Sequence, residues 1–393
     1  MMAKVIVTKD GLIQLPPDFL KNHAFNPGME LVFEPREHGV WLYFARPDVK
    51  KAYIEVTTAC NLNCAMCVRQ VWQDGMGSMS EATFQSVREG LREFPDLKRV
   101  VFGGYGEPLL HPRLLDMVAQ IHSLGPGITL ITNGVLLEQR LAEEMIRAGV
   151  DTLVVSLDSM HIQAYQEAGL ESGLGRVLDN LHALSELIRD RGWRLPALGL
   201  EFIATQINLA ELAQLPKLAR QVGASFVIVN NLLPHTHQME QEILYDRDKP
   251  LQLGGGWGIH RSGWIEWGFP KLPKMKWGAR RKCPFVDDLS LTIGWDGAVS
   301  PCSALMHSYT YYHYGRKKEV FRYVLGYAGE SSLGEIWTSE EYVTFRAKVE
   351  DFRFPSCVDC GMDCTYAQEN SDCFGNTPSC ADCLWAQGIL HCP

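Results

Sequence analysis

Three cysteines near the start of the chain, Cys60, Cys64 and Cys67, have a spacing that suits metal chemistry. They follow an apolar, strand-like stretch, and a short C-x3-C-x2-C loop can bring three thiolates to one metal centre. Thiolates select iron–sulfur clusters, zinc or copper(I). A [4Fe–4S] cluster takes four ligands, so a triplet leaves one iron open to a ligand from outside the protein. Structural zinc favours two paired hooks instead, and no cysteine lies between Cys67 and Cys283.

Glycines, small polar residues and two carboxylates follow the next three predicted strands. Glycines allow the backbone to approach a ligand closely, and a carboxylate accepts hydrogen bonds from an ammonium group. Each feature alone is common in the loops of α/β proteins, but their succession after a cysteine triplet indicates one ligand site. The residues are Gly103, Gly104 and Glu107 after the first of these strands, Asn133 after the next, and Ser156 and Asp158 at the end of the third.

A second cysteine-rich region lies near the end of the sequence. Nine cysteines suffice for two four-ligand clusters with one left over, or for one cluster and several unligated thiols. A zinc-ribbon-like structural site is the alternative, and spacing alone does not give the connectivity. Either metal would stabilise this region. The nine are Cys283, Cys302, Cys357, Cys360, Cys364, Cys373, Cys380, Cys383 and Cys392.

The triplet and the polar strand ends together resemble the radical SAM superfamily. The resemblance implies that S-adenosylmethionine (SAM) chelates the open iron of a [4Fe–4S] cluster and is cleaved to a 5′-deoxyadenosyl radical. It further implies that Glu107 and its glycines hold the SAM amino group, and that Asn133, Ser156 and Asp158 contact the SAM carboxylate or ribose. Relatives often carry an aromatic residue before the third cysteine, where it touches adenine. Met66 takes that place here, and a thioether also packs against a purine.

The later cysteines resemble an auxiliary-cluster domain of the SPASM type. Cys283, Gly297 and Cys302 match its opening C-x9–15-G-x4-C pattern, and Cys357-x2-Cys360 matches a later hook, although the following spacing departs from the family. The resemblance implies one or two auxiliary [4Fe–4S] clusters. It places Cys283 and Cys302 on one cluster, with a later cysteine, and Cys357 and Cys360 on the other.

Alternating strands and helices must position these groups. Ser80 is the expected N-cap of the first helix, and Asn208 with Glu211 has the pattern of a capping box ahead of a later helix. Repeated βα units imply an α/β fold with parallel strands and right-handed crossovers. Six units suit the partial (β/α)6 barrel of the radical SAM resemblance, with reactive groups at the carboxyl ends of the strands. Strands are predicted at 53–57, 98–103, 127–132, 151–157, 197–204 and 224–230.

The sequence divides into four segments: 1–48, the barrel at 49–230, a bridging segment at 231–282 and the cysteine-rich domain at 283–393. The first is a small β-rich module that alternates apolar and polar residues around an Asp10–Gly11 turn. Its pattern resembles the swapped-hairpin domain of AbrB-type transition regulators. The resemblance implies a homodimer or a docking module, and a plain β-appendage is the alternative.

Two further runs, 230–239 and 378–389, resemble the radical SAM maturases that accompany tungsten-containing aldehyde oxidoreductases. The first run follows the sixth predicted strand and contains His235 and His237. At the mouth of the barrel these histidines would serve as acid–base or metal-contacting groups for a substrate. A surface loop is the alternative at this position.

Composition limits the kinds of partner and the location in the cell that we expect for the protein. The formal net charge of −9 argues against a nucleic-acid partner, which calls for a basic face. No apolar run reaches the roughly 18 residues of a membrane span, and the N-terminus lacks the apolar core of a signal peptide. We therefore expect a cytoplasmic protein, in which metal ligation is favoured over disulfides.

Three functions remain open. The leading hypothesis is a radical SAM enzyme that matures a tungsten oxidoreductase polypeptide or its pterin cofactor, with a ferredoxin-type electron donor. The second keeps the radical chemistry but modifies a ribosomal peptide or a protein, as sulfatase maturases do. The third is an iron–sulfur redox sensor that binds DNA through the N-terminal module. Glu107, Ser156 and Asp158 disfavour the sensor, since a sensor needs no SAM contacts.

Overall fold

A computed structural model describes most of the chain. The described residues are 6–10, 13–14, 31–36, 39–44, 48–157, 173–192, 196–245, 281–313, 315–358, 360 and 369–392. The chain divides into two units, Met1–Pro47 and Asp48–Pro393. Most of the bridging segment, Asp158 and Cys364 lie outside the described residues.

The N-terminal unit contains two antiparallel hairpins. Strand β1 (Ile6–Val7) pairs with β2 (Ile13–Gln14), and β3 (Leu31–Arg36) pairs with β4 (Gly39–Phe44). The first pair flanks the Asp10–Gly11 position at which the sequence predicts a turn. The resemblance to AbrB-type domains stays a prediction.

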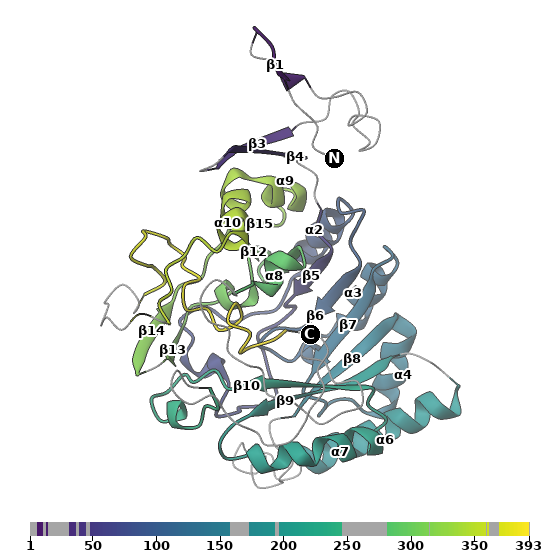
Figure 1. Cartoon of the computed structure of the whole chain (residues 1–393). Helices are drawn as coiled ribbons and strands as arrows, with labels where there is room; N and C mark the ends of the chain where they lie inside the picture. Colours follow the sequence, from purple (N-terminus) through teal and green to yellow (C-terminus); the bar gives the residue numbers. More distant parts are fainter. Residues whose placement is uncertain are drawn as a thin grey trace. The chain divides into compact units, whose positions relative to one another are not determined.

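The second unit is built on six parallel strands, which confirms the predicted α/β class. They lie side by side in chain order, β5-β6-β7-β8-β9-β10, and each pairs in parallel with the next. Figure 1 shows them curving through the molecule with helices on one side. The strands are β5 (Lys51–Ile54), β6 (Arg99–Phe102), β7 (Gly127–Thr132), β8 (Val150–Leu157), β9 (Ala197–Ala204) and β10 (Phe226–Asn231).

Helices connect the strands and bury their apolar faces. The first, α2 (Glu81–Leu91), begins as predicted at Ser80, whose hydroxyl accepts a hydrogen bond from the backbone N–H of Thr83 at 3.1 Å. Phe84 and Val87 on its inner face are fully buried. The others are α3 (Leu114–His122), α4 (Gln139–Ala148), α6 (Gly173–Asp190), α7 (Leu215–Gln221), α8 (Pro284–Asp287), α9 (Leu333–Thr338) and α10 (Glu340–Glu350).

Short 3-10 turns lie at several loops: η1 (Val68–Val71), η2 (Pro108–Leu110), η3 (Leu209–Ala213), η4 (Met239–Gln241) and η6 (Ser303–Leu305). The capping box predicted at Asn208 is wrong. Its side-chain oxygen accepts from the N–H of Thr205 at 2.7 Å, and its amide donates to the carbonyl of Ile203 at 2.8 Å. A local turn toward the preceding strand therefore takes the groups that would have capped the helix.

The cysteine-rich region continues the barrel sheet, which the sequence did not predict. Strand β11 (Ser290–Ile293) pairs in parallel with β5, and β12 (Ala298–Ser300) and β15 (Gly326–Tyr327) add antiparallel strands beyond it. Strands β11 and β12 form a hairpin, and Gly297 at its turn has a φ of 84°. A separate hairpin joins β13 (Tyr309–His313) to β14 (Arg316–Val320).

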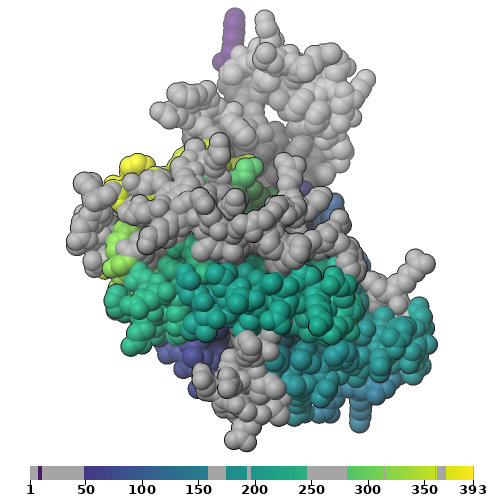
Figure 2. Space-filling view, turned by 60° about the horizontal axis from the view of Figure 1, so that its bottom comes forward, coloured from purple at the N-terminus to yellow at the C-terminus, as the bar shows by residue number. Residues whose placement is uncertain are grey.

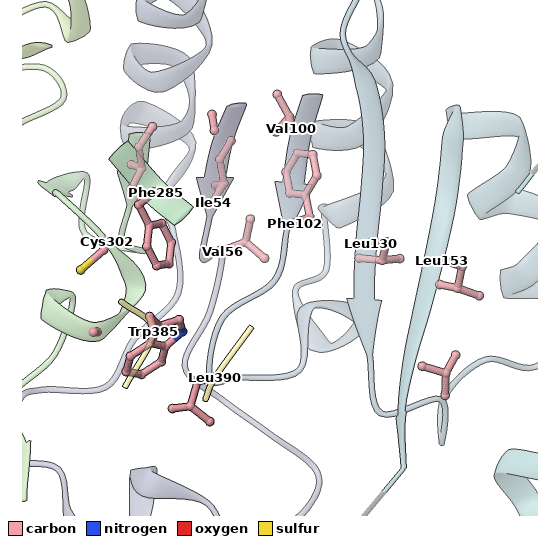
Figure 3. Packing of buried hydrophobic residues seen from close by; sticks show 14 of the residues in the cluster. Ile54, Val56, Val100, Phe102, Leu130, Leu153, Phe285, Cys302, Trp385 and Leu390 are labelled. Carbon is pink, nitrogen blue, oxygen red and sulfur yellow. The ribbon is translucent and has the colours of Figure 1, made fainter. Parts of the chain in front are cut away.

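Barrel and cysteine-rich region share one hydrophobic core. Ile54 and Phe102 of the barrel belong to the same buried cluster as Phe285, Trp385 and Leu390. Figure 3 shows Trp385 and Leu390 near the ends of the first two barrel strands. The last described segment is thus part of the barrel's interior rather than an appended tail.

On the outer side, α6 and α7 lie beside β9 and β10, and residues of this region form the teal surface in Figure 2. Among the described residues, no helix has the length and apolarity required to cross a membrane.

Candidate active site

The three cysteines of the triplet lie in a loop directly after β5, at the carboxyl end of the barrel. Cys60, Cys64 and Cys67 are each partly buried, and all three line a cavity of about 340 Å³. The loop is folded by backbone hydrogen bonds, including one from Cys67 N–H to the Cys64 carbonyl at 3.1 Å. The cavity falls within the usual size of small-molecule sites.

A close backbone approach fixes this loop to the end of β6. A Cβ on Gly106 would stand 2.1 Å from the Thr57 carbonyl oxygen and 2.8 Å from that of Ala59. Only glycine fits there, and the next residue, Glu107, donates its N–H to the Ala59 carbonyl at 2.8 Å. Sequence reasoning expected the glycine run to approach a ligand. Gly106 approaches the protein's own loop, and all three glycines, Gly103, Gly104 and Gly106, line the cavity.

Glu107 is a buried carboxylate that joins two strand ends, with 2% of its surface exposed. One oxygen, Oε1, accepts from Leu109 N–H at 3.0 Å and from the Thr132 hydroxyl at 2.8 Å; the other, Oε2, accepts from Asn133 N–H at 2.8 Å. Burial raises the pKa of Glu107, and these hydrogen bonds oppose the rise. Since a carboxylate has about four acceptor positions, Oε2 can take one further donor from the cavity.

Asn133 couples the end of β7 to the triplet. Its side-chain amide donates to Oδ1 of Asn61 at 2.8 Å and lies 3.8 Å from the sulfur of Cys60. Its own oxygen accepts from the N–H of Val135 at 3.0 Å, which fixes the orientation of the amide. Met66 and Ser156 also line the cavity. All the described residues that were predicted to contact SAM therefore face one cavity.

The opposite wall of the cavity comes from β9 and β10, and sequence reasoning missed it. The amide of Asn230 donates to Oε1 of Glu201 at 2.6 Å, and Asn231 lines the cavity beside them. Two signals in the sequence could have indicated this wall. They are the carboxylate of Glu201 within the apolar 197–204 run and the pair Asn230 and Asn231 at the end of the last barrel strand.

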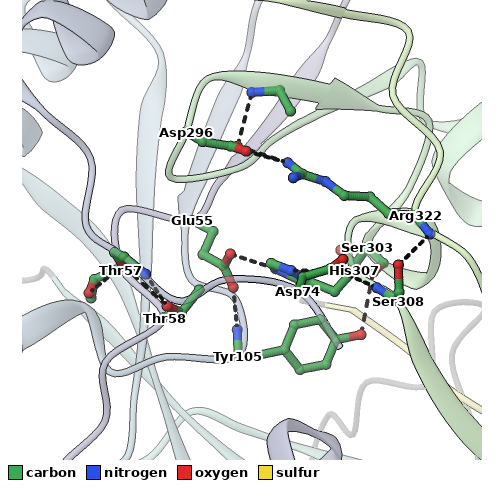
Figure 4. A network of polar contacts seen from close by, with 12 residues as sticks. Glu55, Thr57, Thr58, Asp74, Tyr105, Asp296, Ser303, His307, Ser308 and Arg322 are labelled. Atoms are coloured by element: carbon green, nitrogen blue, oxygen red, sulfur yellow. Dashed lines mark hydrogen bonds and ion pairs between the residues drawn. The ribbon is translucent and has the colours of Figure 1, made fainter. Parts of the chain in front are cut away.

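A buried polar network connects the triplet loop, the barrel and the cysteine-rich region (Figure 4). Glu55, 1% exposed, accepts from Tyr105 N–H at 2.9 Å and pairs with Nε2 of His307 at 2.7 Å. The other ring nitrogen of His307 lies 3.8 Å from a carboxylate oxygen of Asp74. Trp72 stacks on the imidazole, with ring centroids 3.9 Å apart. This contact holds the segment after Cys67 against the C-terminal region.

Four thiols of the C-terminal region lie close together. Burial raises the pKa of Cys302 well above its usual value, and the neighbouring thiols of Cys283 and Cys383 raise it further. The pKa of Cys380 is raised in the same way, by burial and then by Cys383, Cys283 and Cys302. Burial, with Cys383 nearby, raises the pKa of Cys283 to about 12. These four cysteines form what we call the four-thiol group.

The remaining described thiols lie elsewhere. Burial raises the pKa of Cys357 to about 11, with Asp382 and the thiol of Cys373 as further contributors. Cys360 is half-buried. No three histidine, cysteine or acidic side chains among the described residues are arranged to hold a single metal ion.

The donor chemistry of both sites fits iron–sulfur clusters. Three soft thiolates at the cavity suit a [4Fe–4S] cluster that keeps one open iron, and the four-thiol group suits a fully ligated cluster.

The two predicted substrate histidines do not line this cavity. His235 is buried, and burial lowers its pKa. The side chain of His237 is 73% exposed and lies 3.3 Å from a carboxylate oxygen of Glu240. Their role at the substrate stays a prediction.

Comparison with protein-family models agrees with this geometry. Residues 54–202 match the radical SAM superfamily, and residues 283–365 match an iron–sulfur cluster-binding domain of the SPASM type. The fold and site thus define a radical SAM enzyme with a SPASM domain.

Relatives define the family more narrowly. The chain is 36% identical over 355 residues to the tungsten-containing aldehyde ferredoxin oxidoreductase cofactor-modifying protein of Pyrococcus furiosus. The aligned region covers 88% of this chain and 97% of that protein. This chain belongs to the family of that cofactor-modifying protein.

Other similarities cover less or are more distant. The PqqA peptide cyclase of Gluconobacter oxydans is 29% identical over 52% of this chain and 64% of its own length. The structure of Streptococcus suis SuiB bound to S-adenosylmethionine has a TM-score of 0.52 at 16% identity, over 88% of this chain and 73% of that chain. At that identity the likeness concerns the fold.

Proposed function

We propose that this protein modifies the cofactor of a tungsten-containing aldehyde oxidoreductase, or the oxidoreductase polypeptide, by radical chemistry. When bound, the reduced [4Fe–4S] cluster and SAM supply a 5′-deoxyadenosyl radical. The observation that carries the proposal is the shared cavity: the triplet, the carboxylate of Glu107 and residues of the SPASM region line the same space. Substrate specificity is inferred from the family relative, whose name specifies cofactor modification.

In this proposal the protein's residues bind, orient and exclude water. Cys60, Cys64 and Cys67 would hold the [4Fe–4S] cluster and would leave one iron for SAM. The free acceptor position of Glu107 takes the SAM ammonium group, because an ionised donor and acceptor form a strong hydrogen bond. Asn133 fixes the loop of Cys60 and adds a polar contact, while Met66 packs against the adenine. Ser156 contacts the ribose or carboxylate, and Asp158 is proposed for the same role.

The auxiliary region is proposed to carry one closed cluster on the four-thiol group. A second cluster would take Cys357, Cys360, Cys364 and Cys373. A low-potential iron–sulfur protein of the ferredoxin type is the proposed electron donor. We propose a cytoplasmic location, and a homodimer through the N-terminal module.

A peptide substrate is the second candidate. The similarity to a peptide cyclase supports it, but that similarity covers about half of this chain, whereas the cofactor-modifying relative covers 88%. The cavity, with about 340 Å³, also suits a compact substrate better than an extended peptide. The sensor hypothesis would leave the Glu107–Asn133 arrangement without a use.

The test uses a tungsten aldehyde oxidoreductase produced without any maturase. The reconstituted, reduced protein is incubated with this oxidoreductase and SAM under anaerobic conditions. Mass spectrometry of the extracted cofactor and of the digested polypeptide should then show a mass change that requires both SAM and the triplet. A change in neither, together with modification of a peptide encoded nearby, would favour the second candidate.

A further inference from the structure

One thiol of the cysteine-rich region differs from the other described thiols of that region in its surroundings. The pKa of Cys302 responds to two neighbouring thiols and that of Cys380 to three, and the pKa of Cys357 responds to Cys373. The pKa of Cys392 is raised chiefly by burial, and the next largest influences are Trp385, Lys51, Glu201 and Ser303; none of these leading influences is a cysteine. Two four-ligand clusters would use eight of the nine cysteines of this region and leave one unligated. The structure indicates that Cys392 is the unligated cysteine.

Cys392 lies in the SAM cavity. It lines the same 340 Å³ space as Cys60, Cys64, Cys67 and Glu107. It therefore stands on a wall of the chamber in which the radical is formed, apart from the four-thiol group.

The position of this thiol is held by the strand opposite. Asn230 pairs with the backbone of the adjacent residue, His391: its amide donates to the His391 carbonyl at 3.0 Å and its oxygen accepts from the His391 N–H at 2.7 Å. Asn231 donates to the carbonyl of Ile389 at 3.1 Å. Two successive asparagines thus fix the segment that carries Cys392 to the end of β10 by three hydrogen bonds to two of its residues.

A second feature of the same wall points to a ligand. The hydroxyl of Thr292 lines the cavity, and the residue is 1% exposed. Its oxygen has no hydrogen-bond partner in the described part of the chain. Thr292 lies opposite Tyr53 in the β11–β5 register, and the pKa of Tyr53 in turn responds to Cys392. Because an unpaired buried hydroxyl costs free energy, we expect a polar atom of the substrate to pair with it.

We propose that Cys392 is not a cluster ligand but the hydrogen-atom donor of this cavity, acting on a carbon-centred radical of a substrate bound beside Thr292. The S–H bond is weaker than an aliphatic C–H bond, so transfer of its hydrogen to a carbon radical is downhill. A thiol on this wall therefore donates its hydrogen atom to a carbon radical that forms within its reach. The inference rests on the proposed radical SAM function.

The step balances as follows. The S–H bond of Cys392 breaks, a C–H bond forms on the substrate carbon, and the product leaves as a closed-shell molecule. The thiyl radical left on Cys392 takes one electron from a low-potential iron–sulfur donor, the class that must also reduce the cluster, and one proton from solvent. Burial in the cavity raises the pKa of Cys392 to about 11, so the sulfur holds a hydrogen atom to give at neutral pH.

The test exploits exchange of the thiol hydrogen with solvent. The reconstituted full-length protein is reduced with dithionite in D2O, with SAM and no added thiol or substrate, so that the 5′-deoxyadenosyl radical itself serves as the carbon-radical probe. Hydrogens on carbon do not exchange. The phenol O–H of a tyrosine does exchange and can also donate to a carbon radical, and Tyr53 and Tyr105 line the cavity, so the label is assigned to Cys392 only by its loss in the cysteine variant. Wild-type protein should give 5′-deoxyadenosine that carries one deuterium at C5′. Cys392→Ser should give unlabelled product, and Met306→Leu, which alters the cavity lining without touching a thiol, should keep the label.

The outcomes separate the two proposals. If no 5′-deoxyadenosine forms in the wild type, the proposed function fails. If it forms without deuterium, or with equal deuterium in Cys392→Ser, only the inference about Cys392 fails.

A second readout does not depend on turnover. Cys392→Ser should retain the full iron content of the wild type, whereas Cys383→Ser should lose about four irons. Loss of about four irons from Cys392→Ser would identify it as a ligand and overturn the inference.

Discussion

The triplet and the four-thiol group place the same ligand chemistry in opposite settings. Cys60, Cys64 and Cys67 lie on a loop and face a cavity, whereas Cys302 and Cys380 are buried and hold strongly raised pKa values. An incomplete ligand set beside a cavity suits a cluster that must bind a second molecule. A complete set within the core suits a cluster that is part of the fold. The difference separates a reactive site from a structural or electron-carrying one.

The largest expected effect comes from removing one thiol from each set, which tests whether the two sets differ in their contribution to stability. Cys383→Ser should lose about four irons and unfold at a much lower temperature, because its cluster stabilises the shared core. The matched variant Cys64→Ser should also lose about four irons but melt within a few degrees of wild type. Iron analysis and thermal unfolding by circular dichroism measure both effects. Equal loss of stability in the two variants would remove the distinction.

The link between the two regions can be tested at His307. His307→Ala leaves the buried carboxylate of Glu55 without its partner, and we expect a loss of about 3 kcal/mol in the free energy of unfolding. Adding Glu55→Gln should recover part of that loss, because the charge is removed together with its partner. Denaturant unfolding of the two single variants and the double variant gives the coupling. If the changes in unfolding free energy of the two single variants add up to that of the double variant, the Glu55–His307 pair does not link the barrel to the cysteine-rich region.

The free acceptor position of Glu107 predicts a pH-dependent affinity for SAM. Burial raises the pKa of Glu107, so protonation as the pH falls through that raised value should remove the acceptor and weaken SAM binding. Glu107→Gln should bind SAM about 10- to 100-fold more weakly at neutral pH, as expected for one lost charged hydrogen bond. The variant should also lack the pH dependence. Equilibrium dialysis between pH 5 and 8 measures both quantities, and unchanged affinity in the variant would exclude this contact.

The smallest expected effect concerns Asn133. Asn133→Ala removes the bond to Asn61 and should cost about 1 kcal/mol of stability. It should also change the electron paramagnetic resonance spectrum of the triplet cluster while leaving that of the auxiliary cluster alone. Asn180→Ala is the matched control: Asn180 lies on α6 and its loss removes bonds to the carbonyls of Gly134 and Val135 on the same loop. A spectral change in the auxiliary cluster would contradict the assignment.

Local patterns predicted the barrel well. The alternation of apolar runs with amphipathic helices placed all six strands. The described residues at the strand ends line one cavity, and their contacts with SAM stay a prediction, as does the role of Asp158, which lies outside the described part. These features depend on short-range periodicity and on the fixed polarity of parallel strands. Asn208 shows the limit of such reasoning: a capping pattern was present, but a turn to Thr205 used the same groups.

Contacts between distant segments could not be predicted. Glu55 and His307 are 252 residues apart in sequence, and nothing local to either indicates the other. The pairing of β11 with β5, which brings Thr292 into the cavity, and the docking of Ile389 and His391 on β10 are of the same kind. Each depends on how the cysteine-rich region packs on the barrel, for which the sequence carries no periodic signal.

The most direct test of the account is the formation of 5′-deoxyadenosine by two proteins that differ only in the triplet. After anaerobic reconstitution and reduction, the wild type should cleave SAM to 5′-deoxyadenosine. The triple variant Cys60→Ala/Cys64→Ala/Cys67→Ala should form none, although it keeps its auxiliary iron. Cleavage by the triple variant, or none by the wild type with all its iron in place, would contradict the central claim.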